Sequence, residues 1–173
     1  MKLEIQTSYE AVDLEFCLFH KTGGDKMNIR KMTIDDYQKV YSLWMSCTGM
    51  GLNSLDDSKE GIQKFLERNP ETCFVAENKT EILGAIMAGN DGRRGYIYHT
   101  SVNPEFQGKG IGSELVNAAI KALERCGINK VALVVFGRNR AGNAFWEKQG
   151  FSARDDLVYR NKAIKTMERM PQP

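Results

Sequence analysis

The residues most suited to chemistry lie in the stretch VNPEFQGKGIGSELV, from Val102 to Val116. Gly108, Gly110 and Gly112 occupy every second position directly before an apolar run with helical spacing. Glycine costs ordering entropy and adds no side chain to a core, so this concentration indicates that something approaches the backbone closely. A helix N-terminus also exposes unpaired N–H groups and the positive end of the helix dipole. The stretch therefore predicts a loop that binds an anion, most often a phosphate.

Two common phosphate-binding patterns fit this loop poorly. A Walker loop needs Ser or Thr after its Gly-Lys pair, whereas Lys109 is followed by Gly110. A dinucleotide fingerprint needs G-x-G-x-x-G inside a βαβ unit, but Ser113 stands where the third glycine belongs. Taken alone, the three glycines are equally consistent with a strand-to-helix turn that binds no ligand.

The stretch QGKGIG (107–112) resembles the Q/R-x-x-G-x-G/A signature of the GCN5-related N-acetyltransferases. Downstream, NRAGNAFWEKQGF (139–151) is similar to the family's second motif, an Asn followed by an aromatic-rich segment that ends in Gly-Phe. The resemblance covers about residues 27–165. It implies an acyl-CoA N-acyltransferase fold and direct transfer of an acetyl group from acetyl-CoA to a primary amine in a ternary complex. Neither motif contains a cysteine, so nothing in them supports an acyl-cysteine intermediate.

The resemblance also implies where acetyl-CoA binds. Its pyrophosphate is expected on the backbone amides of the glycine loop, and its pantetheine in a gap between 96–102 and 130–136, paired with backbone like an added strand. The resemblance implies that Asn139 contacts the pantetheine arm, and a helix N-cap is an equally suitable role for this residue. The expected cofactor-binding residues are Thr100, Ser101, Val102, Gln107, Gly108, Lys109, Gly110, Ile111, Gly112, Ser113, Asn139, Asn143 and Trp146.

Three residues are candidates for the chemical step. The backbone N–H of Val102 is expected to stabilise the thioester oxygen as it gains negative charge. His99 is a candidate general base because histidine changes charge near neutral pH, and a merely hydrogen-bonded strand histidine is the alternative. Tyr98, expected on the opposite face of the strand, is a candidate acid or pocket wall. Asp56 and Asp57 either steer a cationic amine or serve as surface charges or helix caps.

Trp146 departs from the family pattern. Many members have a tyrosine there that protonates the leaving thiolate, and an indole N–H lacks the acidity for this role. Either another group protonates the thiolate, or the thiolate leaves unassisted or with a proton from water. Trp146 is then expected to pack against the cofactor or the core. This departure also favours an alternative function, a non-catalytic acyl-CoA-binding or regulatory module on the same fold. A third possibility is an interaction protein that uses residues 1–26 as an edge strand or dimer arm.

Hydrophobic periodicity and turn signals predict the elements that position these residues. The sequence predicts an α/β (α+β) fold with a mixed, mostly antiparallel central sheet and helices on both faces. The predicted strands are 27–32, 72–78, 81–91, 94–102, a central strand at 130–136 and a last strand at 157–164, and the predicted helices begin near Thr33, Ser58, Gly108 and Arg140.

Three segments differ in character. Residues 1–26 form an N-terminal extension of unknown role that ends in a flexible break, KTGGDK (21–26). The resemblance implies that residues 27–165 form a single N-acetyltransferase domain, and residues 166–173 are expected to form a loose tail.

The composition is that of an ordinary soluble protein, with 173 residues and 42% hydrophobic side chains. A net charge of +2 gives no argument for nucleic acid or a membrane surface as a partner. Four scattered cysteines and two histidines predict no metal site and favour reduced thiols in the cytoplasm. The expected partners are acetyl-CoA and an amine acceptor, either a small molecule or a protein, and a homodimer is possible.

Overall fold

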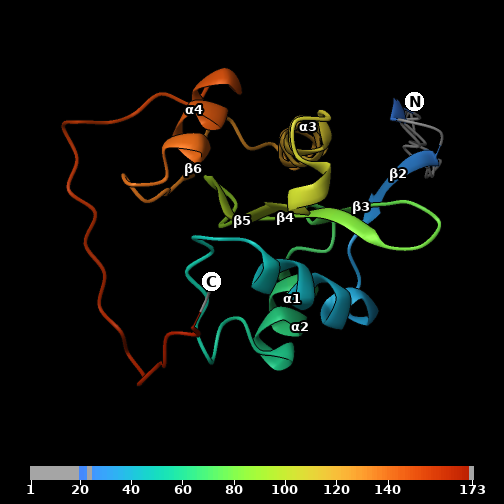
Figure 1. Ribbon diagram of the computed structural model, residues 1–173. Helices are drawn as coiled ribbons and strands as arrows, with labels where there is room; N and C mark the ends of the chain where they lie inside the picture. Colours follow the sequence, from blue (N-terminus) through green and yellow to red (C-terminus); the bar gives the residue numbers. More distant parts are fainter. Residues whose placement is uncertain (1–19, 23–24, 172–173) are drawn as a thin grey trace, which may run out of the picture.

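The computed structural model in Figure 1 describes residues 20–22 and 25–171. Its elements, in chain order, are β1 (His20–Thr22), β2 (Asp25–Lys31), the 3-10 helix η1 (Ile34–Asp36), α1 (Tyr37–Ser46), α2 (Lys59–Arg68), β3 (Phe74–Glu77), β4 (Ile82–Asn90), β5 (Gly95–Val102), the 3-10 helix η2 (Pro104–Phe106), α3 (Ile111–Arg125), β6 (Val131–Leu133) and α4 (Arg140–Lys148).

One six-stranded sheet organises these elements, with the strands in the order β1-β2-β3-β4-β5-β6. Neighbouring strands are antiparallel except β5 and β6, which are parallel. Figure 1 shows α1 and α2 on one face of the sheet and α3 on the other. The structure thus confirms the predicted mixed, mostly antiparallel sheet with helices on both faces.

β4 is the strand that both helical layers cover, and all of its residues except the last are buried. Its small residues allow close approach, because a Cβ added at Gly84 would lie 2.9 Å from Leu115 Cδ1 of α3. The α3 side of the core contains Ile86 and Leu123, and the α1–α2 side contains Trp44. Burial of these side chains on both faces of β4 stabilises the sheet that holds β5 in place.

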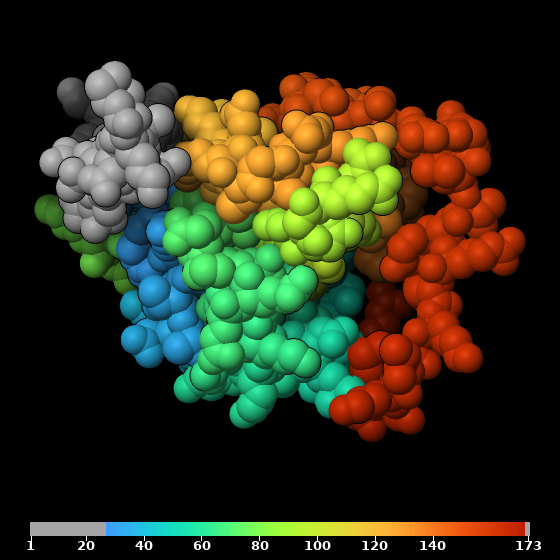
Figure 2. Space-filling model, turned by 180° about the vertical axis from the view of Figure 1, so that it is seen from behind, coloured from blue at the N-terminus to red at the C-terminus, as the bar shows by residue number. Residues whose placement is uncertain are grey.

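The prediction of a central strand at 130–136 is wrong in position. β6 spans only Val131–Leu133 and lies at the edge of the sheet, and Val134 and Phe136 are exposed. The predicted last strand at 157–164 is also wrong, because this segment is not a strand and pairs with none. The prediction rested on the apolar side chains of this segment, yet Ile164 is 96% exposed. Such residues favour a strand only where they fit a half-buried sheet surface, and this segment has none among the described residues to pack on. Figure 2 shows the orange-red atoms of this segment standing out from the body of the molecule.

The predictions for the two ends of the chain were partly wrong. Residues 168–170 of the predicted loose tail are held in place, because the N–H of Met170 donates to the carbonyl of Leu52 at 2.9 Å and the N–H of Ser54 to that of Glu168 at 2.8 Å, and residues 172–173 lie outside the described residues. Part of the predicted flexible break belongs to β2, which pairs with β1. Residues 1–19 and 23–24 lie outside the described residues, so the domain boundary at 26 remains a prediction.

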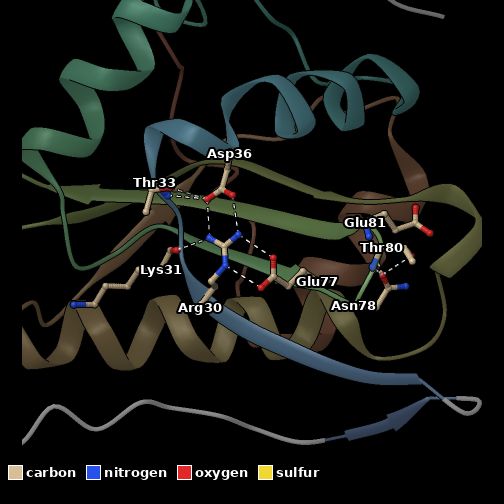
Figure 3. Close-up of polar contacts among 8 residues, drawn as sticks. All are labelled: Arg30, Lys31, Thr33, Asp36, Glu77, Asn78, Thr80 and Glu81. Carbon is tan, nitrogen blue, oxygen red and sulfur yellow. Dashed lines mark hydrogen bonds and ion pairs between the residues drawn. The ribbon is translucent and has the colours of Figure 1, made fainter.

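Arg30 joins β2, β3 and the start of α1 in a network of ion pairs. Its guanidinium donates to both oxygens of Asp36 at 2.7 Å and to Glu77 at 2.8 and 2.9 Å, and it lies between the two carboxylates in Figure 3. Burial alone would raise the pKa of Asp36, but the hydrogen bonds from Arg30 and Thr33 outweigh it and hold the pKa below its ordinary value of 3.8. The hydrogen bonds that Arg30 donates to Asp36 and Glu77 raise the pKa of Arg30. This network fixes the first turn of the helix whose far end reaches the site.

Asp36→Asn is expected to lower the free energy of unfolding by about 2–3 kcal/mol, less than for a fully buried pair because the Arg30 side chain is 36% exposed. The pKa of Asp36 is lower in the folded state than its ordinary value of 3.8. Its contribution to the free energy of unfolding is therefore complete above pH 3.8 and is lost as the pH falls through the folded-state pKa. Urea unfolding at pH 7 and at pH 3 measures both effects. Asp35→Asn, which changes an exposed neighbouring carboxylate, is the matched control. Equal destabilisation by both variants would contradict the role assigned to Asp36.

Candidate functional site

A cleft opens where β5 and β6 part. The two strands pair only through Gly95–Ile97 and Val131–Leu133, so residues 98–102 of β5 have no partner from β6. The cleft that opens beside them has a volume of about 1530 Å³. This confirms the predicted gap between the two strands. Of the predicted site residues, those that line the cleft are Tyr98, His99, Thr100, Ser101, Val102, Gln107, Gly108, Gly110, Ile111, Gly112, Ser113, Asn139 and Trp146.

The glycine loop leads directly into α3 at one wall of the cleft. Gly108 and Gly110 have φ of 75° and 85°, a left-handed conformation that favours glycine. Gly110 is the N-cap of α3 and provides no side-chain cap. The first helical hydrogen bond runs from the N–H of Glu114 to the Gly110 carbonyl, so the N–H groups of residues 111–113 have no partner within the helix. These groups are available to an anion in the cleft.

Gly112 serves a different purpose from the other two glycines. A Cβ at this position would lie 3.2 Å from the Phe145 ring, tighter than most such contacts, so the absence of a side chain lets α4 pack against the start of α3. The hydroxyl of Ser113 accepts a hydrogen bond from Gln149 Nε2 at 2.9 Å, which also joins the two helices. Lys109 does not line the cleft, and its ammonium lies 4.5 Å from the centre of the Phe106 ring.

The backbone of β5 presents hydrogen-bonding groups to the cleft. The N–H of Asn103 donates to the Leu83 carbonyl of β4 at 2.8 Å, so by alternation the N–H groups of Val102 and Thr100 point away from β4 and into the gap. The Val102 carbonyl points the same way, and it accepts hydrogen bonds from Gln107 Nε2 at 3.2 Å and Cys47 Sγ at 3.6 Å. The Val102 N–H is therefore a donor on the cleft wall.

A β-bulge in β5 places Tyr98 and His99 on the same face of the sheet. Met87 of β4 pairs with His99 and the next residue pairs with Ile97, so Tyr98 is the extra residue. The Tyr98 ring lies edge-on to Phe65 of α2 at 5.1 Å, and the His99 ring lies 5.0 Å from Trp44 of α1. The prediction that Tyr98 is on the opposite face is therefore wrong, because the extra residue shifts the alternation by one.

Asp57 is the functional candidate whose environment the sequence did not reveal. It is only 4% exposed, so the interpretation as a surface charge is wrong. Its Oδ1 lies 2.6 Å from His99 Nε2, and its Oδ2 accepts the N–H of Asn53 at 2.7 Å. Ser58, rather than an aspartate, caps α2 by accepting the Gly61 N–H. Asp56 remains at the surface.

Helix α4 forms the wall opposite β5. The Asn139 side chain accepts the N–H of Gly142 at 2.9 Å, which confirms its N-cap role. Asn143 does not line the cleft, and its amide donates to the carbonyls of Phe136 and Asn139. Trp146 packs edge-on against Phe145 and Phe151, as its predicted packing role requires.

The remaining features of the described chain concern other kinds of site. Burial raises the pKa of the Cys47 thiol, which opposes its use as a nucleophile near neutral pH. Cys47, Cys73 and Cys126 are free thiols, and Cys17 lies outside the described residues. Within residues 20–22 and 25–171 there is no cluster of three metal-ligating side chains. None of the helices described there is long and apolar enough to cross a membrane.

Known proteins with similar sequences are acetyltransferases. The model of the Acetyltransferase (GNAT) family matches residues 37–151. An acetyltransferase of Sodalis glossinidius is 33% identical over 138 residues, which cover 80% of this chain and 96% of the relative. An acetyltransferase of Photorhabdus laumondii is 34% identical over 144 residues, covering 82% of this chain and 99% of the relative.

Solved structures of acetyltransferases share the fold. A PaiA N-acetyltransferase from Thermoplasma acidophilum, in complex with coenzyme A, superposes with a TM-score of 0.66 at 23% identity, covering 75% of this chain and 91% of the other. An aminoglycoside acetyltransferase from an uncultured soil metagenomic sample, in complex with sisomicin, superposes with a TM-score of 0.65 at 21% identity, covering 80% and 97%. At these identities the likeness shows the fold alone, and it confirms the predicted acyl-CoA N-acyltransferase fold.

Proposed function

The chain belongs to the acetyltransferase (GNAT) family, and from this premise we propose that it transfers the acetyl group of acetyl-CoA directly to a primary amine within a ternary complex. The observation that carries the proposal is the convergence of two sets of backbone donors on one cleft. The uncapped start of α3 suits a pyrophosphate, and the outward N–H groups of β5 suit the pantetheine and the thioester.

The residues around the cleft fit acetyl-CoA. The amides of residues 107–112 and Ser113 would hold the pyrophosphate, with Lys109 adding positive charge from the surface. The hydroxyl of Thr100 is buried and has no hydrogen-bond partner among the described residues. Pantetheine running along β5 would contact Thr100, Ser101 and Val102. Asn139 and Trp146 would then shape the opposite wall, and Asn143 would support it from behind through its hydrogen bonds to the carbonyls of Phe136 and Asn139.

The proposed reaction exchanges a C–S bond for a C–N bond. His99 takes a proton from the acceptor ammonium, and the amine lone pair forms a bond to the thioester carbon. The Val102 N–H stabilises the oxygen as it gains negative charge. The C–S bond then breaks and the thiolate leaves. The nitrogen gives its second proton to water, and the thiolate takes a proton from water, because Trp146 offers no acid.

The acceptor enters on the α1–α2 side of β5, beside His99 and the exposed ring of Tyr98. Structural neighbours include an aminoglycoside acetyltransferase with bound sisomicin and a glucosamine-6-phosphate N-acetyltransferase from Arabidopsis thaliana. Amine acceptors of this chain are therefore to be sought among aminoglycosides, amino sugars, polyamines and peptides with a free N-terminus or lysine. Release of free CoA thiol in the presence of each amine measures transfer.

Acetyl-CoA and CoA are expected to raise the thermal unfolding midpoint by several degrees, whereas ATP and NADH are not. Saturation at about 100 times the Kd stabilises the folded state by roughly 2.7 kcal/mol, which accounts for a shift of this size. The four ligands are compared in parallel by differential scanning fluorimetry. Absence of a shift with both CoA species would contradict the proposal. A shift without CoA release from any amine would support a non-catalytic acyl-CoA-binding module instead.

A further inference from the structure

We infer that Asp57 is a positioning residue that fixes the tautomer and orientation of His99 for proton removal, an inference that rests on the proposed function. The pair joins β5 to the loop before α2 across 42 residues of sequence. The 2.6 Å distance between His99 Nε2 and Asp57 Oδ1 is short for a nitrogen–oxygen hydrogen bond. The two side chains are 15% and 5% exposed, so water competes little for their hydrogen bond.

The hydrogen bond determines which nitrogen of His99 can act as a base. An ionised carboxylate only accepts hydrogen bonds, so His99 Nε2 must carry the proton that it shares with Asp57. In the neutral ring, Nδ1 then keeps its lone pair. His99 lines the cleft, and in the inferred mechanism Nδ1 is the nitrogen that receives the proton of the acceptor amine.

Asp57 is itself held from several directions. Its second carboxylate oxygen accepts the N–H of Asn53 at 2.7 Å, and its backbone carbonyl accepts the hydroxyl of Tyr37 at 3.0 Å. The loop that carries it is braced by the C-terminal segment, because Leu52 and Ser54 form backbone hydrogen bonds with residues 168–170. A carboxylate fixed in this way needs no reorganisation when its partner gains a proton.

The Trp44 ring restricts His99 from the α1 side. Its centroid lies 5.0 Å from the imidazole at an interplanar angle of 54°. Titratable neighbours of the pair include Tyr37, whose hydroxyl donates to the Asp57 carbonyl, Tyr98, which precedes His99 on β5, and Asp56 and Glu60 around Asp57. Asp57 is the carboxylate that contacts the imidazole ring in the described part of the chain. When His99 Nδ1 accepts the proton of the ammonium, the resulting imidazolium faces this carboxylate and is stabilised by it.

The test compares Asp57→Asn with Asp56→Asn, which removes the adjacent exposed carboxylate. In Asp57→Asn the amide N–H donates to Nε2, so the proton moves to Nδ1 and the base is lost. We expect kcat to fall roughly 100-fold or more with an unchanged KM for acetyl-CoA, and Asp57→Glu to recover part of the loss. In a His99→Ala background, Asp57→Asn should cause no further loss. An equal fall in kcat in both backgrounds would overturn the inference.

A measurement on the unaltered protein tests the role of Asp57 without relying on catalysis or on correct folding of the variants. Imidazole ¹⁵N NMR of neutral His99 is expected to show a protonated Nε2 and an unprotonated Nδ1. The opposite tautomer would overturn the role of Asp57 even if acetyl transfer were observed. If the chain bound no acetyl-CoA, the proposed function would fail while the expected tautomer was still present, so the two failures are distinguishable.

Discussion

His99→Ala is expected to lower kcat for acetyl transfer by about 10²- to 10⁴-fold, the usual contribution of a positioned general base. The acceptor arrives as an ammonium ion and has no lone pair for attack until a proton is removed. The His99 side chain lies in the cleft beside the part of β5 that is unpaired on its β6 side, so its loss affects this step and leaves the cofactor contacts intact. Steady-state kinetics with a responsive amine, together with acetyl-CoA affinity from thermal shifts, measure both quantities.

The pH dependence separates a base from a residue that merely shapes the cleft. In the unaltered protein, kcat should rise with pH and then reach a plateau, the profile of a reaction that needs an unprotonated base. In His99→Ala the rise should follow the free amine of the acceptor and move to higher pH. Tyr98→Phe, which removes only a hydroxyl on the adjacent exposed ring, is the control and should leave the profile in place. A normal profile in His99→Ala would exclude His99 as the base.

The elements whose signals are local in sequence were predicted from the sequence alone. The apolar stripe after the glycine loop and the glycine at 127 predict the helix observed as α3 (Ile111–Arg125). The turn signal at 91–92 predicts the β4–β5 hairpin. The edge position of β6 and the exposed course of 157–164 were not predictable, because they depend on which strands pair across the sheet. An apolar run such as 130–136 has the same composition at an edge as in the centre.

The same distinction applies to the site. The glycine loop and Asn139 were predictable because left-handed glycines and an N-cap act on neighbouring backbone. Two features of the site around β5 could not be predicted from the sequence. The bulge that turns Tyr98 onto the face of His99 is a property of its pairing with β4. The contact between Asp57 and His99 arises only when the sheet brings distant segments together.

Val102→Pro is expected to lower kcat by about 10²- to 10³-fold, the usual effect of removing one donor from an oxyanion site. Proline has no backbone N–H, and the N–H of Val102 points into the cleft rather than to β4. The substitution therefore removes the proposed oxyanion donor without removing a hydrogen bond of the sheet, and proline is tolerated at strand positions of this kind. Acetyl-CoA should still raise the unfolding midpoint, since the start of α3 is unchanged.

Val102→Ala is the matched control, because it trims the side chain and keeps the N–H. A Cβ at Gly112 would lie 3.6 Å from Val102 Cγ2, so the side chain helps to pack β5 against α3, and its loss should affect stability more than kcat. If proline and alanine lowered kcat equally, the N–H of Val102 would have no special role. The developing charge would then have to be stabilised elsewhere in the cleft, and the outward N–H of Thr100 would be the next donor to remove.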